Sequence, residues 1–242
     1  MKTTSIALVL AVASLASGSL RATPSLATTL ASWNFDSTTI SGASTDFGPI
    51  TADFGTGSST GHHSSSSTWS SPAGNASVKS FSSNTWAVGD YYQFQTSTTG
   101  FGGINVSWDQ TGSATGPKDF KLQYSINGTS WTDFARYSLI VNGTPNTAWS
   151  SAGSHNSAFT FSYDLSTLSL LDNQTAAYFR LTDISTVSLN GGTVASGGTD
   201  RIDNFTVAAI PEPSTYALFA GLAGFAVAFW RRNARINTTS SV

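Results

Sequence analysis

Cysteine is absent from the 242 residues, glutamate occurs once, and charged residues make up only 10% of the chain. Without cysteine, disulfides and cysteine chemistry are excluded, so the folded part must rely on an apolar core. The formal net charge of -2 gives no reason to expect a nucleic-acid partner. A chain poor in charge and rich in Ser, Thr, Gly and aromatic residues is typical of an exported all-β protein.

The scarcity of acidic and basic groups also bears on catalysis. Glycoside hydrolysis needs two carboxylic acids, yet the one glutamate, Glu212, lies near the C-terminus, and the twelve aspartates fall mostly at expected strand ends and turns. A Ser-His-Asp site would have to use His62, His63 or His155, and His155 lies in a Ser/Gly/Asn stretch. We therefore expect no enzyme, and a secreted carbohydrate-active enzyme is the alternative.

An uncharged apolar run with aromatic ends occupies residues 216–230 near the C-terminus, and Arg231, Arg232 and Arg235 follow it. Aromatic ends and adjoining arginines are typical of a membrane span with a cytoplasmic basic end. As a helix the run would cover roughly 22 Å, less than the hydrocarbon core of about 30 Å. Snorkelling arginines bring it near spanning length. We expect a transmembrane helix, with a buried core helix as the alternative.

Pro211, Glu212 and Pro213 stand directly before this segment. The order of Pro-Glu-Pro, apolar segment and arginine cluster resembles the PEP-CTERM sorting signal over roughly residues 210–235. The resemblance implies export in a Gram-negative bacterium, anchoring in the inner membrane, processing by an exosortase-type enzyme, and then a cell-surface or extracellular location. One departure is a tail, residues 236–242, after the last arginine.

The N-terminus has the pattern of a signal peptide. Lys2 supplies the positive end, residues 6–16 are apolar, and both 16–18 and 25–27 fit a small-x-small cleavage site. The predicted organisation has four parts: a signal peptide at 1–27, an exported domain at 28–208, a sorting and membrane segment at 209–235, and a short tail at 236–242.

Within the exported domain, apolar residues alternate with polar ones in short segments typical of strands. The predicted strands include residues 31–36, 91–95, 104–108, 120–126, 131–140, 158–164, 177–183 and 201–207. Asn127-Gly128 is a strong hairpin signal because both residues tolerate positive φ. We expect nine or ten strands, no long helix, and an antiparallel β-sandwich.

Two segments add a fold-level resemblance. Residues 122–131 (LQYSINGTSW) and 198–207 (GTDRIDNFTV) resemble a hairpin and the closing strand of galactose-binding-like jelly rolls. The resemblance implies a jelly-roll-like sandwich whose first and last strands lie side by side, but no particular ligand, because one sandwich serves many functions.

That resemblance also implies a candidate structural calcium site where the first and last strands meet. The oxygen ligands on offer there are Asn34, Asp36, Asp200 and Asp203; ordinary turn and strand-end chemistry is the alternative. The paired His62 and His63 lie in a Ser-rich stretch, residues 37–77, which we interpret as a flexible loop; a metal site there would lack a third ligand.

Tryptophan supplies the candidate ligand-binding residues, because the face of an indole ring can stack on a sugar. Trp33, Trp108 and Trp131 fall in strand patterns and are expected in the core. Trp69, Trp86 and Trp149 lie nearer loops and are the candidate sugar platforms. The sequence thus predicts a non-catalytic binding or structural protein of the extracellular matrix, with polysaccharide as its expected partner; a purely structural surface protein is a further alternative.

Overall fold

The structure is a computed structural model that describes residues 27–212, 221–222 and 224–225. The strands are β1 (Thr28–Trp33), β2 (Ser41–Thr51), β3 (Phe54–Gly55), β4 (Gly57–Ser70), β5 (Phe81–Ser83), β6 (Tyr91–Thr96), β7 (Phe101–Gly112), β8 (Asp119–Ser125), β9 (Thr132–Ser138), β10 (Thr160–Asp164), β11 (Ala177–Asp183) and β12 (Asp200–Pro211). Two 3-10 turns, η1 (Ser157–Phe159) and η2 (Ser169–Leu171), also occur, and residues 221–222 and 224–225 are helical.

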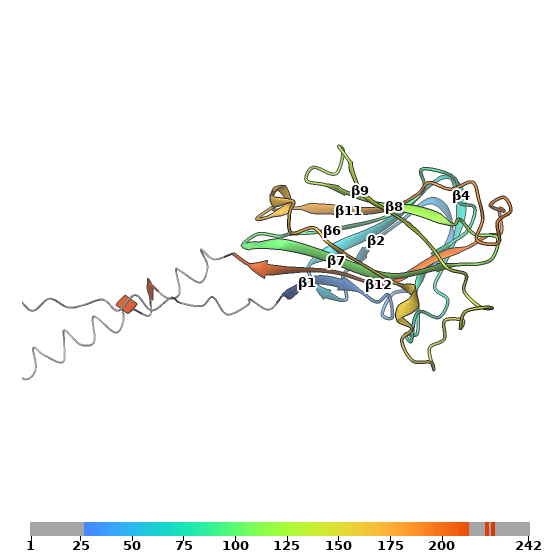
Figure 1. The fold of residues 1–242 in the computed structure, drawn as a ribbon, viewed down its shortest axis with the longest axis horizontal. Coiled ribbons are helices and arrows are strands. Elements are labelled where there is room, and N and C mark those ends of the chain that lie inside the picture. The colour runs from blue at the N-terminus through green and yellow to red at the C-terminus, as the bar shows by residue number, and fades with distance from the viewer. Residues whose placement is uncertain (1–26, 213–220, 223, 226–242) are drawn as a thin grey trace, which may run out of the picture.

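The strands form two layers in which every ladder between named strands is antiparallel (Figure 1). One layer has the order β10-β7-β12, with β1 also pairing to β12. The other has the order β2-β4-β6-β11-β8-β9. Strand β5 joins the layers at one side, because Ser82 and Ser83 pair with both β12 and β4. The predicted all-β antiparallel architecture is confirmed.

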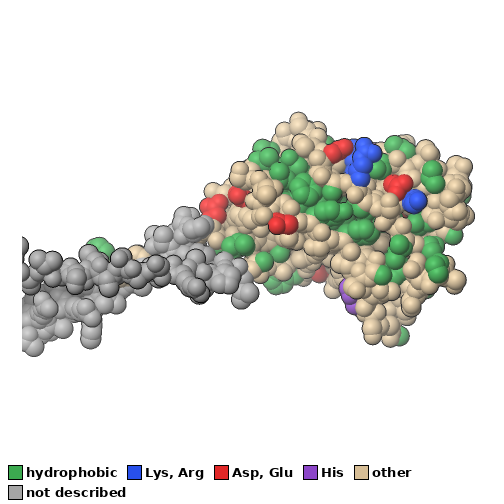
Figure 2. All heavy atoms as spheres, viewed as in Figure 1, with side chains coloured by type: hydrophobic (Ala, Val, Ile, Leu, Met, Phe, Trp, Pro, Cys, Tyr) green, Lys and Arg blue, Asp and Glu red, His purple; other side chains and the backbone are tan. Residues whose placement is uncertain are grey.

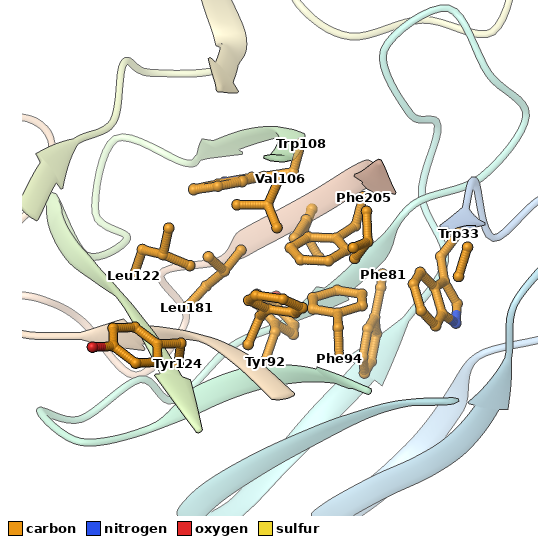
Figure 3. Packing of buried hydrophobic residues seen from close by; sticks show 14 of the residues in the cluster. Trp33, Phe81, Tyr92, Phe94, Val106, Trp108, Leu122, Tyr124, Leu181 and Phe205 are labelled. Atoms are coloured by element: carbon orange, nitrogen blue, oxygen red, sulfur yellow. The ribbon is translucent and has the colours of Figure 1, made fainter. Parts of the chain in front are cut away.

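The core lies between the layers and is largely aromatic. Figure 3 shows Val106, Trp108 and Phe205 from β7 and β12 facing Tyr92, Phe94 and other side chains from the opposite layer. Alternation produces this core, because every second residue of each strand points inward. Trp33 and Trp108 are buried as predicted, at 0% and 1% exposure.

The first and last strands are neighbours, as the jelly-roll resemblance implies. Thr28 pairs with Ala209, and Trp33 with Phe205. Strand β12 runs to Pro211, which pairs with Phe101, so the strand extends past the predicted domain boundary at residue 208. The described domain consequently begins and ends at the same end of the sandwich (Figure 1).

The interpretation of residues 37–77 as a flexible loop is wrong, because β2 and β4 occupy most of that stretch and pair with each other. The inward positions of β4 include Ser59, Gly61 and His63, so the stretch lacks the apolar alternation that reveals a strand. Gly61 is required there because a Cβ at this position would lie 2.3 Å from the ring of Trp69.

The Asn127-Gly128 turn connects β8 and β9 as predicted, with Gly128 at a φ of 72°. Residues 1–26 of the predicted signal peptide (1–27), together with Pro213, Arg231, Arg232 and Arg235, lie outside the described residues. In the part of the chain that is described, no helix has the length and apolar character needed to cross a membrane.

Candidate functional site

The candidate site is the outward side of the layer formed by β4, β6, β11 and β8, which we call the outer face. Strand β11 lies in the middle, with Arg180 opposite Gln93 of β6 and Gln123 of β8. Because Phe179 and Leu181 point into the core, Arg180 between them points outward. The outward residues of β6 and β11 are partly buried instead of fully exposed, apart from Thr182, which is buried.

Four planar side chains line up across the outer face, and we call them the planar stack. The rings of His62 and Tyr91 stack with centroids 5.1 Å apart. The Cζ of Arg180 lies 3.6 Å from the centroid of Tyr91 and 3.9 Å from that of Trp131. Cation–π contacts of this kind hold a guanidinium in one orientation. Tyr178 meets Trp131 edge-on at 6.5 Å and extends the row of aromatic side chains.

Glutamine side chains form a hydrogen-bond network beside the planar stack. Arg180 Nε donates to Gln93 Oε1 at 2.8 Å, and Arg180 Nη2 donates to the Tyr91 hydroxyl at 2.9 Å. Gln123 Oε1 accepts from Thr182 at 2.8 Å, while its Nε2 donates to Asp133 at 2.7 Å. These bonds fix the amide and guanidinium planes relative to the sheet.

Several donors and acceptors on the outer face have no partner within the described residues. They include Arg180 Nη1, Gln93 Nε2 and the whole amide of Gln95. An open hollow lined in part by Ser58, Gln95 and Ser97 continues the face toward one end of the sheet. Figure 2, which shows one side of the molecule, has few charged side chains and several hydrophobic patches among side chains of other types. The amide and guanidinium groups without partners on the outer face suit a ligand rich in hydroxyl groups.

The structure corrects the predicted roles of the tryptophans. Trp69, Trp86 and Trp149 are buried, at 1%, 6% and 6% exposure, so their ring faces are not available to stack on a sugar. Trp69 and Trp86 pack around the His63 ring in the core. Trp131, predicted to be core, is instead partly exposed on the outer face. Residues just beyond a turn need not follow the strand alternation, which explains the error.

The candidate calcium ligands already have hydrogen-bond partners. Asn34 Oδ1 accepts from the Asp36 backbone N–H, and Asp36 Oδ1 accepts from the Lys79 N–H at 2.8 Å. Asp200 Oδ1 accepts from a glutamine side chain at 3.0 Å, and Asp203 Oδ2 from a backbone N–H at 2.9 Å. No group of three or more His, Asp or Glu side chains suited to a metal ion occurs among the described residues. Calcium binding stays a prediction.

Two neighbouring aspartates, Asp109 and Asp203, pair across β7 and β12 and are buried. Burial raises the pKa of Asp203 to about 7. Asp109 accepts from Thr160 at 2.6 Å, from Asn204 at 2.9 Å, and lies 3.0 Å from a ring nitrogen of His155. Donors from the protein itself thus bind the oxygens of both carboxylates, which argues for a structural role.

The remaining histidines are held by aspartates. His63 is fully buried, with Nδ1 2.7 Å from Asp90 and Nε2 2.9 Å from Ser83. His62 lies on the outer face, 2.6 Å from Asp46. A Gly-x-Ser-x-Gly spacing at residues 57–61 lies inside β4, where Ser59 is buried. A nucleophilic serine of this motif stands instead at an exposed strand-to-helix turn.

Comparison with known proteins bears first on the C-terminal end. Residues 209–233 match the family model described as the PEP-CTERM protein-sorting motif, which confirms the predicted motif. The motif begins inside β12, and Pro211 and Glu212 are described: the Glu212 N–H donates to the Gly100 carbonyl at 3.0 Å. No curated protein matches the chain.

The chain is also similar in fold to solved carbohydrate-binding modules and adhesin domains. The CBM22-1 xylan-binding domain of Paenibacillus barcinonensis Xyn10C has 9% identity and a TM-score of 0.38, over 78% of this chain and 99% of that one. A CBM61 module in complex with β-1,4-galactotriose has 12% identity and a TM-score of 0.29, over 60% and 72%. The K1 cleaved adhesin domain of Lys-gingipain from Porphyromonas gingivalis has 13% identity and a TM-score of 0.37, over 58% and 82%. With TM-scores below 0.5, these likenesses transfer no ligand to this chain.

Proposed function

We propose that this chain is an exported, membrane-sorted protein whose jelly-roll-like sandwich binds polysaccharide on its outer face without catalysing a reaction. The single observation that supports the binding role is the planar stack with its adjoining glutamines. Aromatic side chains there can pack on the apolar side of a sugar ring, while the free amide and guanidinium donors bind hydroxyl groups.

The sorting motif supports the destination. The PEP-CTERM match at 209–233 supports an exosortase-type enzyme as a partner and an anchor in the membrane. We infer that the membrane is the inner membrane of a Gram-negative cell and that the processed protein then has a surface or extracellular place. Since the domain begins and ends at one end of the sandwich, the anchor would hold it by that end. The outer face would then lie parallel to the membrane normal, where matrix polysaccharide can reach it.

The burial of the neighbouring aspartates that the structure describes on β7 and β12 favours binding over hydrolysis. A glycosidase presents two carboxyl groups to its substrate, whereas the neighbouring Asp109 and Asp203 are buried and hydrogen-bonded to protein groups. A secreted carbohydrate-active enzyme is the alternative, and a screen for polysaccharide hydrolysis tests it.

A panel of immobilised polysaccharides probed with the full-length chain tests the proposal. We expect binding to at least one polymer, and weaker binding by a Gln93→Ala variant, since Gln93 lies at the centre of the outer face. Asn105→Ala is the matched control, because Asn105 is a partly buried amide on the other layer. Failure to bind any polymer, or equal loss in both variants, would overturn the proposal.

A further inference from the structure

Arg180 is a partly buried cation without an acidic partner. Its two hydrogen bonds within the described residues go to neutral groups, the Gln93 amide oxygen and the Tyr91 hydroxyl. No Asp or Glu among the described residues lies within ion-pair distance of its guanidinium. Burial lowers the pKa of Arg180, but an arginine stays protonated at neutral pH. The positive charge is therefore uncompensated.

Two other charged groups of the outer face, His62 and Lys121, differ from Arg180 because each has an acidic partner. His62 lies 2.6 Å from Asp46, and Lys121 Nζ lies 2.9 Å from Asp133. Both pairs are more exposed to water at the acidic side chain, which is 69% exposed in Asp46 and 49% in Asp133. The two cations with acidic partners thus lie where water screens their charge. Arg180, whose charge is costly because it is partly desolvated, has no such partner.

The flanking rings hold the uncompensated guanidinium ready for a planar anion. Tyr91 and Trp131 cover its two sides at 3.6 Å and 3.9 Å, so its remaining N–H groups can be approached only along the guanidinium edge. A carboxylate matches this edge, because its two oxygens accept parallel hydrogen bonds from an arginine fork. Gln93 Nε2 offers a further donor beside it.

We propose that Arg180 binds the carboxylate of a uronic-acid unit, so that the ligand of the outer face is an acidic polysaccharide. This inference rests on the proposed function and names its substrate class. Lys121 lies on β8, at the position diagonal to Arg180 of β11. Arg136 of β9 pairs directly with Lys121. These two side chains extend the cationic part of the face toward β9.

The charge balance of the outer face favours a ligand that carries fewer charges per unit length than a nucleic acid. On this face the cations Arg180, Lys121 and Arg136 stand against the two aspartates of the ion pairs and Asp119, which points outward at the start of β8. A nucleic acid requires several phosphate-neutralising cations along its path. A uronate polymer, with one carboxylate in each acidic unit and hydroxyls elsewhere, matches one desolvated arginine among amides.

The test compares acidic polymers with the same polymers after reduction of their carboxyl groups to primary alcohols. Polygalacturonate and alginate, each with its carboxyl-reduced form, are offered to the full-length chain purified in detergent. We expect the wild type to bind one acidic polymer at least about tenfold more tightly than its reduced form. A charge-assisted hydrogen bond between Arg180 and the carboxylate contributes this much to affinity, and the reduced form cannot make it. Dextran sulfate, included as an arm, separates a carboxylate from a sulfate ester.

Variants locate the effect on the outer face. Arg180→Gln keeps hydrogen-bonding capacity without charge, and we expect it to bind the acidic polymer about tenfold or more weakly while binding the reduced form as the wild type does. Lys118→Gln removes an equal charge from an exposed position before β8 and is expected to change nothing. If Arg180→Gln fails to fold, the comparison of polymers on the wild type decides alone.

Each outcome separates this inference from the proposed function. Equal binding of acidic and reduced polymers, binding of neutral polymers alone, or tighter binding of dextran sulfate would overturn the uronate inference and leave polysaccharide binding intact. Unchanged binding by Arg180→Gln would remove Arg180 from the site. Binding to no polymer, acidic or neutral, would overturn the proposed function itself.

Discussion

The rings of Phe94 on β6 and Phe205 on β12 stack face to face, with centroids 3.6 Å apart and an angle of 4° between their planes. This contact joins the two layers at the middle of the core. Phe205 also meets the rings of Trp33, Trp108 and Phe179. One side chain of β12 therefore packs against strands of both layers.

Replacing Phe205 by alanine should lower the free energy of unfolding by about 3–5 kcal/mol, because the ring is fully buried and its loss leaves a cavity. Urea unfolding of a chain comprising residues 27–212 measures this. Val78→Ala is the control, since Val78 is 63% exposed and should change the free energy by less than about 0.5 kcal/mol. A loss below about 1 kcal/mol in Phe205→Ala would contradict the packing described.

Gly61→Ala should destabilise the domain by about 1–3 kcal/mol, because the added methyl group would collide with the buried ring of Trp69. Gly197→Ala provides the comparison, since a Cβ there meets no atom within 4 Å. Thermal denaturation of both variants checks this prediction. Equal midpoints would show that the indole does not lie over residue 61.

The end of β12 determines where the domain can be truncated. A chain ending at Glu212 keeps the pairing of Pro211 with Phe101 and the bond to Gly100, whereas a chain ending at Ala208 loses them together with buried Ala209. We expect the shorter chain to be less stable by at least about 1 kcal/mol. Both should leave the membrane fraction that holds the full chain. Retention of either with the membrane would contradict anchoring through the C-terminal segment.

Stability should fall as the pH rises from about 4 to about 7. Burial raises the pKa of Asp183 to about 7 in the folded state, and Oδ2 of this carboxyl has no partner among the described residues. An unfolded Asp titrates near 3.9, so the folded state binds the additional proton within this window and each pH increase there favours unfolding. Above pH 7 the contribution is lost and the dependence flattens.

The melting midpoint measured between pH 4.5 and pH 8 tests this sign. Asp183→Asn removes the titrating group while keeping an oxygen to accept from the Ser185 N–H, so its midpoint should depend less on pH. Asp203 carries a similarly raised pKa of about 7, and some slope should therefore remain. A wild-type midpoint that rises steadily over this range would contradict the assignment.

Much of the fold was predictable from alternation, whereas the composition of the site was not. The pattern around Phe179 and Leu181 implies that Arg180 points outward. Which rings enclose it depends on strand order, and nothing in the sequence places residues 91 and 131 on either side of β11. Trp131 lies in the connection just before β9, so it does not follow the alternation of that strand and its side chain lies on the outer face.

The Ser-rich residues 57–70 show why β4 was missed. Its inward positions hold Ser59, Gly61 and His63, and the neighbouring Trp69 fills the space that they leave. A strand whose small residues accommodate a large ring has no apolar periodicity to detect. The sorting motif was recognisable for the opposite reason, since its three parts follow one another in the sequence itself.

Polysaccharide binding by the outer face can be observed directly in the indole N–H spectrum of the full-length chain. The chain carries ¹⁵N-labelled tryptophan and is titrated with a polysaccharide that it binds. Trp131 lies in the planar stack, while Trp69, Trp86 and Trp149 are buried elsewhere. A Trp131→Phe variant assigns the resonance. We expect the Trp131 signal to shift on binding while those of the buried tryptophans stay in place. Binding that leaves the Trp131 signal unchanged would contradict the assignment of the outer face as the polysaccharide site.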